Sequence, residues 1–213
     1  MDGSTPIAGE AGGRDALADA LFRIGALRFG RFTLASGKSS SYYLDLRIVP
    51  SDPEAYALAV SAYLALIKEI GEKNLEAIAG VATAGITISS PLAYLLRKPM
   101  LYVRSEQKGH GLGRQVEGAV RPGWRTVVVD DLATTGGSIA SAVGPLRKAG
   151  CVVQDAVVLL DRLEGARANL AAEGVKLHAF TDIGDLAKTL FNQRKITKAD
   201  LQAVQKQMEG VPL

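Results

Sequence analysis

The sequence contains a single cysteine, Cys151, and this scarcity limits its chemistry. One cysteine cannot form a disulfide within the chain, and it cannot supply the several thiolates of a cysteine-based zinc site. The first ten residues are acidic and lack a basic segment followed by an apolar one, so no signal peptide is expected. A reducing compartment, the cytoplasm, is therefore the expected location.

Long apolar runs and strong charge are also missing. The uncharged run over residues 77–96 contains glycine, proline and hydroxyl residues, which make it too polar for a membrane-spanning helix. The net charge is only +3, which fits an anionic small substrate and also weak nucleic-acid binding. The sequence has no helix-turn-helix pattern and no dense basic stripe, so no nucleic-acid partner is expected. Since no segment is apolar enough to span a bilayer, no membrane partner is expected either.

Short apolar segments alternate with helical patterns. Strands are expected over residues 77–82, 100–103, 126–129, 152–160 and 175–180, and helices over 14–27, 86–96, 138–149, 164–172 and after Thr197. A further helix is expected from a capping box of Ser51 and Glu54 to Gly71. The alternation predicts an α/β fold with a mainly parallel sheet flanked by helices. Residues 1–13 are expected to be a flexible tail, and 14–213 a single domain.

The most informative segment is TVVVDDLATTGGSI, residues 126–139, where a buried strand ends in two acids and a turn of small residues leads into a helix. The backbone N–H groups of such a turn and the helix N-terminus suit a phosphate dianion. Asp130 and Asp131 would repel a phosphate, and vicinal ribose hydroxyls are better partners for them. A sugar that carries a 5-phosphate would satisfy both halves of the motif.

A second unusual segment is RSEQKGHGLGRQVEG, residues 104–118, which is rich in glycine and cations and has no apolar periodicity. A segment of this length without periodicity is either a solvated surface loop or a functional one.

The 126–139 string resembles the phosphoribosyl-diphosphate-binding motif of the type I phosphoribosyltransferases. The resemblance implies that Asp130 and Asp131 hold the ribose hydroxyls and that the following loop binds the 5-phosphate. It implies a donor site that includes Asp130, Asp131, Leu132, Ala133, Thr134, Thr135, Gly136, Gly137 and Ser138. It also implies a diphosphate loop of Thr83, Ala84 and Gly85, and a small hood from about residues 14–48 and 182–213.

Three further segments resemble orotate phosphoribosyltransferases. FTLASGKSSSYYLD, residues 32–45, is similar to their base-contacting N-terminal segment. Arg104, Lys108 and His110 match their lid loop, which closes over the active site of the neighbouring subunit and contacts the donor. The LDR of residues 160–162 implies that Arg162 binds the orotate carboxylate, with Thr134 as a second base contact.

The resemblance implies transfer of ribose 5-phosphate from phosphoribosyl diphosphate to orotate, in pyrimidine (UMP) biosynthesis. Lys108 and Asp131 are the expected catalytic residues. Mg²⁺ is the implied cofactor, held mainly by substrate and water and by no direct protein ligand. A homodimer follows from a lid that acts across subunits. The chain has Ala35, Ala84 and Ser105 at positions where many or some members have lysine.

Two other functions stay open at this point. A purine or uracil phosphoribosyltransferase would use the same donor motif with a neutral base, which needs no cation such as Arg162. A non-catalytic regulator that senses phosphoribosyl diphosphate is the other alternative, and the mild basicity of the chain motivates it.

Overall fold

The computed structural model describes residues 11–33, 37, 39–104 and 115–210. The chain forms two compact units. Unit 1 combines residues 1–62 with 181–213, and unit 2 comprises residues 63–180. The boundary between the units falls within helix α2 (Pro53–Ile70).

Unit 2 is built around a seven-stranded sheet with the order β5-β4-β3-β6-β8-β7, and β9 also pairs with β8. Its strands are β3 (Ala77–Val81), β4 (Met100–Val103), β5 (Val116–Glu117), β6 (Thr126–Val129), β7 (Leu132–Ala133), β8 (Asp155–Asp161) and β9 (Lys176–Asp182). The pairs β3–β4, β3–β6, β6–β8 and β7–β8 are parallel, and the pair β4–β5 is antiparallel. The predicted α/β fold with a mainly parallel sheet is confirmed.

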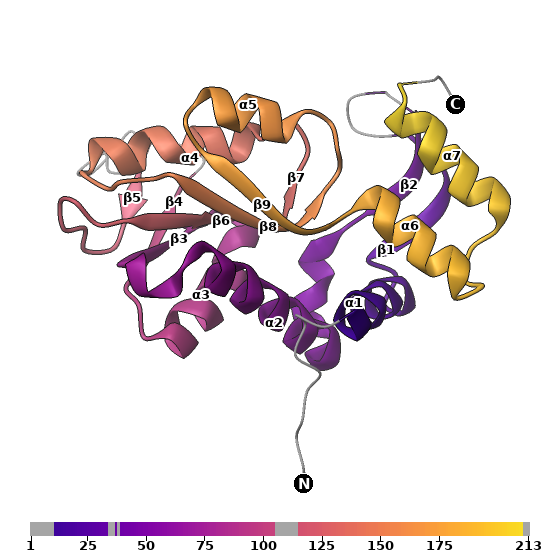
Figure 1. Cartoon of the computed structure of the whole chain (residues 1–213), viewed down its shortest axis with the longest axis horizontal. Coiled ribbons are helices and arrows are strands. Elements are labelled where there is room, and N and C mark those ends of the chain that lie inside the picture. Colours follow the sequence, from indigo (N-terminus) through magenta and orange to yellow (C-terminus); the bar gives the residue numbers. More distant parts are fainter. Residues whose placement is uncertain (1–10, 34–36, 38, 105–114, 211–213) are drawn as a thin grey trace, which may run out of the picture. The chain divides into compact units, whose positions relative to one another are not determined.

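Helices cover both faces of this sheet, with α3 on one side and α4 and α5 on the other (Figure 1). The elements are η2 (Glu72–Asn74), α3 (Ala84–Leu96), α4 (Gly137–Lys148) and α5 (Ala166–Ala172). Strands β3 and β6 are buried along their whole length, which explains why they read as continuous apolar runs rather than as alternating patterns. The interior between sheet and helices is therefore aliphatic.

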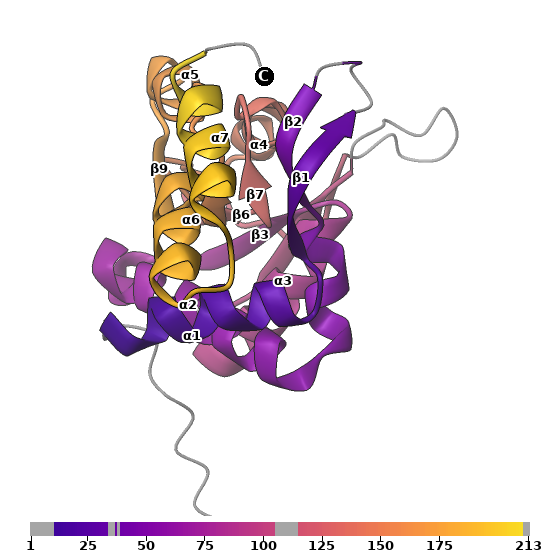
Figure 2. The same ribbon diagram turned by 90° about the vertical axis from the view of Figure 1, so that its right-hand side faces the viewer.

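The described part of unit 1 consists of a two-stranded hairpin, three α-helices and one 3₁₀ helix, in addition to the start of α2. Its elements are α1 (Ala11–Arg23), β1 (Leu27–Thr33), β2 (Ser39–Leu44), the 3₁₀ helix η1 (Leu46–Ser51), α6 (Ile183–Asn192) and α7 (Lys198–Met208). Helix α6 packs against both α1 and α7, and α7 packs against β2 (Figure 2). The hairpin is antiparallel, with an irregularity between Phe29 and Phe32. Helix α7 begins with a capping box between Thr197 and Asp200.

Most predicted elements are present, with shifted ends. Helix α1 ends before the predicted range does, because the chain turns at Gly25 with φ +75°. The capping box predicted for α2 is wrong: Ser51 closes η1, and the Asp52 carboxylate accepts the Ala55 N–H at 2.9 Å instead. Helix α1 begins at Ala11, within the range predicted as a tail, while residues 1–10 lie outside the described part. The division into a tail and one domain stays a prediction.

None of the helices in the described ranges is long and apolar enough to cross a bilayer.

Two glycines let the start of α3 lie directly on the sheet. A Cβ at Gly80 would meet the Ser89 Oγ at 2.3 Å and the Gly85 carbonyl oxygen at 2.8 Å. A Cβ at Gly85 would meet the Val129 carbonyl oxygen at 2.3 Å, and that oxygen belongs to backbone with no freedom to yield. The approach of α3 to the ends of β3 and β6 therefore requires both glycines.

Replacing Gly85 with alanine is expected to lower the free energy of unfolding by about 1–3 kcal/mol, because the added methyl group overpacks a backbone contact. Urea unfolding measures this change. The control is Gly12→Ala, an exposed helical position where a Cβ meets nothing within 4 Å, and it should be neutral or slightly stabilising. Equal stability of the two variants would contradict the close packing.

Candidate active site at the carboxyl ends of four strands

Unit 2 brings the predicted site segments to one edge of its sheet. Strands β4, β3, β6 and β8 are consecutive neighbours in the sheet and run parallel. These strands are followed, in that order, by Arg104, by Thr83 and the start of α3, by the pair Asp130 and Asp131, and by Arg162. Of the predicted diphosphate loop, Ala84 and Gly85 thus belong to the first turn of α3. Ligands in open α/β sheets bind beyond the carboxyl ends of the strands, so this edge is the candidate active site.

The two acids sit where strand β6 ends. The Asp130 side chain is buried, and its Oδ1 accepts the Asp131 N–H at 3.0 Å. The Asp131 carboxylate is half-buried and accepts the Leu132 N–H at 2.8 Å. Burial, together with the neighbouring Asp131 charge, raises the pKa of Asp130 to about 8. Asp131 is therefore the more accessible carboxylate of the pair, and Asp130 is the one that resists ionisation.

The loop after the acids leads to the N-terminus of α4. Gly136 has φ +82°, and a Cβ there would lie 3.0 Å from the Leu170 side chain. The N-cap residue of α4 is Gly136, which has no side chain to bond the first turn, and this leaves the N–H groups of that turn to a ligand. Asn169 of α5 donates to the Thr135 carbonyl oxygen at 2.9 Å and so ties the loop to α5. Thr135, Gly137 and Ser138 are exposed, as a phosphate-binding surface requires.

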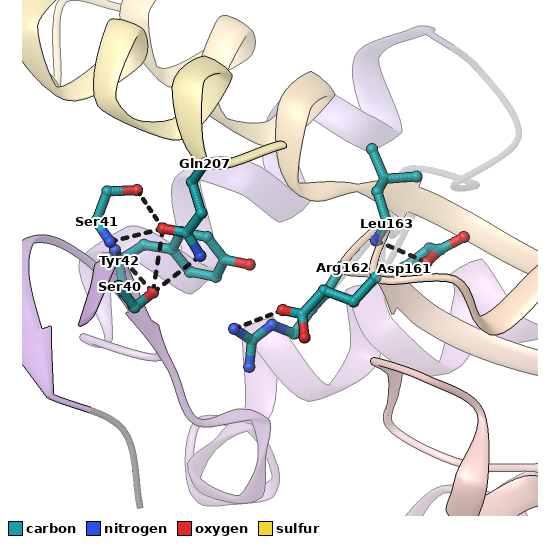
Figure 3. Close-up of polar contacts among 8 residues, drawn as sticks. Ser40, Ser41, Tyr42, Asp161, Arg162, Leu163 and Gln207 are labelled. Atoms are coloured by element: carbon teal, nitrogen blue, oxygen red, sulfur yellow. Dashed lines mark hydrogen bonds and ion pairs between the residues drawn. The ribbon is translucent and has the colours of Figure 1, made fainter. Parts of the chain in front are cut away.

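Arg162 is held next to this loop. Its backbone N–H donates to the Ala133 carbonyl oxygen at 2.9 Å, and its side chain is only 13% exposed. The guanidinium forms an ion pair with Glu164 at 2.8 Å. The turn after Arg162 is fixed by Asp161, a carboxylate that is 1% exposed and accepts the Leu163 N–H at 2.9 Å (Figure 3). Arg167 neutralises Asp161 at 2.8 Å.

The remaining predicted residues lie at two neighbouring strand ends. Thr83 is exposed at the start of α3, and the peptide bond between Ala82 and Thr83 is cis. The Arg104 backbone N–H donates to the Gln115 carbonyl oxygen at 2.9 Å, and its guanidinium pairs with Glu117 at 2.7 Å. Within the predicted lid segment of residues 104–118, this hydrogen bond joins the two described residues that flank residues 105–114. Lys108 and His110 lie outside the described residues.

Two residues that sequence analysis leaves without a role have structural ones. The His178 Nε2 lies 2.8 Å from the Asp155 Oδ1, and both side chains are largely buried. Cys151 is buried beside the core of unit 2. Neither contributes to the strand-end site.

In unit 1, helix α7 holds the strand that carries the paired tyrosines. The Gln207 Oε1 accepts the backbone N–H of Ser41 at 2.7 Å and the Ser41 hydroxyl at 2.8 Å (Figure 3). Tyr43 stacks at a tilt on Phe32, with a ring-centroid distance of 5.7 Å. A cavity of about 460 Å³ lies between the hairpin and α7, and none of the predicted site residues lines it.

The donor groups at the strand ends fit a divalent cation only in part. Among the described residues, no three histidine, cysteine or acidic side chains gather into a metal-binding cluster. Asp130 and Asp131 supply two adjacent carboxylates, and Mg²⁺ commonly uses one or two carboxylates together with substrate phosphates and water. The residues present therefore suit a magnesium ion that arrives with a phosphorylated substrate.

Two residues of unit 2 that support the site, Tyr63 and Asp161, are not expected from the sequence. Tyr63 lies at apolar spacing within the helix predicted to end at Gly71, and its hydroxyl is the only sign of another role. Asp161 lies within the quoted LDR motif, but its partner Arg167 comes from α5, and only the fold brings the two together. In unit 1, no sequence pattern singles out Gln207 as the residue that holds β2.

The raised pKa of Asp130 makes stability pH-dependent. An unfolded aspartate has a pKa near 3.8, whereas the folded value is about 8, so between these pH values only the folded state keeps the proton. The free energy of unfolding should therefore fall as pH rises through this window. Urea unfolding at several pH values should show this fall, which Asp130→Asn should flatten. Asp185→Asn, at a side chain that is 52% exposed, should leave it in place.

Comparisons with known proteins identify the family to which this chain belongs. The Phosphoribosyl transferase domain family matches residues 53–200. An orotate phosphoribosyltransferase of Cenarchaeum symbiosum is 45% identical over 78% of this chain and 84% of its own length. The crystal structure of the Aeropyrum pernix orotate phosphoribosyltransferase is 39% identical, with a TM-score of 0.72 over 82% of this chain and 99% of that one.

The structure of Leishmania donovani UMP synthase is also similar, at 32% identity and a TM-score of 0.81. It covers 92% of this chain, which spans 42% of the length of that longer protein. The matched family spans the strand-end site, and the relatives match most of this chain at 32–45% identity. The chain therefore belongs to the orotate phosphoribosyltransferases, within the type I phosphoribosyltransferase family.

Proposed function

We propose that the strand-end site of unit 2 carries out orotate phosphoribosyl transfer in pyrimidine biosynthesis. The reaction moves ribose 5-phosphate from phosphoribosyl diphosphate to orotate and yields orotidine 5-phosphate and diphosphate. The observation that carries the proposal is the placement of an acid pair, an uncapped helix N-terminus and Arg162 at neighbouring strand ends. These groups match the ribose and the 5-phosphate of the donor and the carboxylate of orotate.

Each part of the donor has a partner in this scheme. Asp130 and Asp131 accept hydrogen bonds from the ribose hydroxyls. Residues 132–138, which run from β7 into the first turn of α4, bind the 5-phosphate. Thr83 and the first residues of α3, Ala84 and Gly85, lie beside the leaving diphosphate, together with Arg104. Lys108 and His110 would add positive charge when the lid closes, an assignment that rests on the family resemblance alone.

Orotate is oriented by Arg162 and Thr134. A guanidinium presents several N–H donors in one plane and can therefore donate to both oxygens of a carboxylate, in a bidentate arrangement. The pairing with Glu164 at 2.8 Å holds the guanidinium in place. Its remaining N–H donors bond more strongly to a carboxylate than to a neutral acceptor, so an anionic base is favoured over a neutral one.

The chemical step is a displacement at the anomeric carbon. Orotate N1 forms a bond to ribose C1 as the bond from C1 to the diphosphate oxygen breaks, through an oxocarbenium-like state. Asp131, the more accessible acid, stands at the ribose, and Lys108 neutralises the leaving group. Water has to be excluded because it would hydrolyse the donor, and a closing lid does this.

The family generally uses Mg²⁺ with phosphoribosyl diphosphate, and we extend this to the present chain. Asp130 and Asp131 are the residues that would help to hold the ion, mostly through water and substrate oxygens. When bound, the ion would neutralise charge on the diphosphate.

The relatives argue against the two other functions considered for this chain. Proteins named orotate phosphoribosyltransferase match it at 40–45% identity, whereas an adenine phosphoribosyltransferase from Saccharomyces cerevisiae, at 18% identity, shares the fold alone. A regulator without activity would not need a buried cation such as Arg162 beside the phosphate loop.

The proposal predicts that orotate absorbance falls only when phosphoribosyl diphosphate and Mg²⁺ are both present. Arg162→Ala should raise the KM for orotate about tenfold to hundredfold, because it removes a charged hydrogen-bonding partner. The control Arg121→Ala removes the same charge from a side chain stacked on Trp124 and should leave the KM for orotate unchanged. Unchanged orotate kinetics in Arg162→Ala would exclude this orotate site, and turnover with a purine instead would favour that alternative.

We further propose a cytoplasmic homodimer whose lid acts on the partner subunit. Two large apolar side chains of α3 support a contact between copies, since Tyr94 is 83% exposed and its neighbour Leu95 is 53% exposed. Light scattering should give the mass of two chains for the wild type and a lower mass for Tyr94→Glu. Val152→Glu, at a position that is 41% exposed, is the matched control. A fully active single chain would rule out a lid shared between subunits.

A further inference from the structure

A tyrosine hydroxyl interrupts the ladder between β6 and β8 at the acid pair. Strand β6 pairs with β8 at Val128 and Val129, and β7 resumes the pairing with β8 at Leu132, in the same register. The residues between the two paired stretches are Asp130 and Asp131. Strands β6 and β7 are thus one strand with a local interruption, and irregularities of this kind re-aim side chains next to active sites.

The hydrogen bonds show what fills the interruption. The Asp130 N–H donates to the Val157 carbonyl oxygen at 3.2 Å, as in a regular parallel ladder. The next bond of that ladder would join the Leu159 N–H to the Asp130 carbonyl oxygen. Instead the Tyr63 hydroxyl lies between them, accepting from the Leu159 N–H at 2.9 Å and donating to the Asp130 oxygen at 2.7 Å.

The inserted hydroxyl also reaches the second acid. It lies 3.3 Å from the Asp131 carbonyl oxygen, and the Leu159 N–H contacts that same oxygen at 3.1 Å. Tyr63 belongs to α2 and is 0% exposed, so its position is set by packing in the core. Burial, together with the charges of Asp131 and Asp130, raises the pKa of the Tyr63 hydroxyl well above its usual value, which keeps it a proton donor.

We propose that Tyr63 is a positioning residue for donor binding, because its hydroxyl spreads the β6–β8 ladder and so directs the Asp130 and Asp131 carboxylates toward the ribose. Without the hydroxyl, the Leu159 N–H could bond directly to the Asp130 oxygen. The ladder would then close, and the peptide between the two acids would turn. This inference rests on the proposed role of the acid pair.

The test compares Tyr63→Phe with Ile67→Val in steady-state kinetics for both substrates. Ile67 is one helical turn further along α2 and is also 0% exposed, so its variant reports loss of packing alone. Tyr63→Phe should raise the KM for phosphoribosyl diphosphate about threefold to tenfold, as the loss of one buried hydrogen-bonding group implies. The KM for orotate should stay within about twofold, and Ile67→Val should change neither value.

Replacement of Tyr63 by 4-aminophenylalanine retains an N–H donor at the same place and should restore donor binding toward the wild type. This variant also provides the test if Tyr63→Phe does not fold. Three outcomes would each overturn the positioning role. Tyr63→Phe could change the KM of both substrates equally, Ile67→Val could have the same effect, or the amino group could fail to restore donor binding. Asp131→Asn separates this from failure of the site itself: if that variant uses the donor normally, the acid-pair assignment is wrong.

Discussion

The site depends on the interruption of one β-ladder. A strand buried on both faces has every N–H and C=O committed to its neighbours, and its side chains point alternately into the two helical layers. Two adjacent acids can follow such a strand only if the backbone leaves the regular pattern there. Tyr63 satisfies the backbone groups that this departure would otherwise leave unpaired, and the strand then resumes as β7. The acid pair lies at this interruption, and the loop that leads into α4 follows the resumed strand.

The unfavourable electrostatic free energy of the site is concentrated at this interruption. Asp130 is buried beside a second acid. Both burial and the Asp131 charge disfavour its ionised form, which is why its pKa is raised. Arg162 and Asp161, by contrast, each have an opposite charge within 2.8 Å. The candidate site therefore holds an ion-paired part around Arg162 and a part in which two acids lie side by side, whose repulsion hydrogen-bond donors or a cation would relieve.

Sequence patterns predict the elements of this fold well where the burial is uniform. Strands β3 and β6 are buried along their whole length, and their predicted ranges agree with the structure to within a residue. The short apolar strand β4, whose burial alternates, also has its predicted range. The strand-end segments could also be found, because the acid pair and the small-residue turn are contiguous. Helix caps were less predictable: Ser51 and Asp52 are both good cap residues, and only the 3₁₀ turn before them decides between the two. The supporting contacts of Tyr63 and Asp161 come from distant segments, so no local pattern reveals them.

The short helix α5 is tied to the phosphate loop from both sides. Asn169 donates to the Thr135 carbonyl oxygen, and Leu170 fills the space that a side chain at Gly136 would need. A group that binds the loop and orders it must then also favour the folded form of α5, because the two share these contacts. By thermodynamic reciprocity, binding at the loop favours order in α5 by the same free energy as order in α5 favours binding. A helix outside the proposed site thus takes part in the binding equilibrium at the loop.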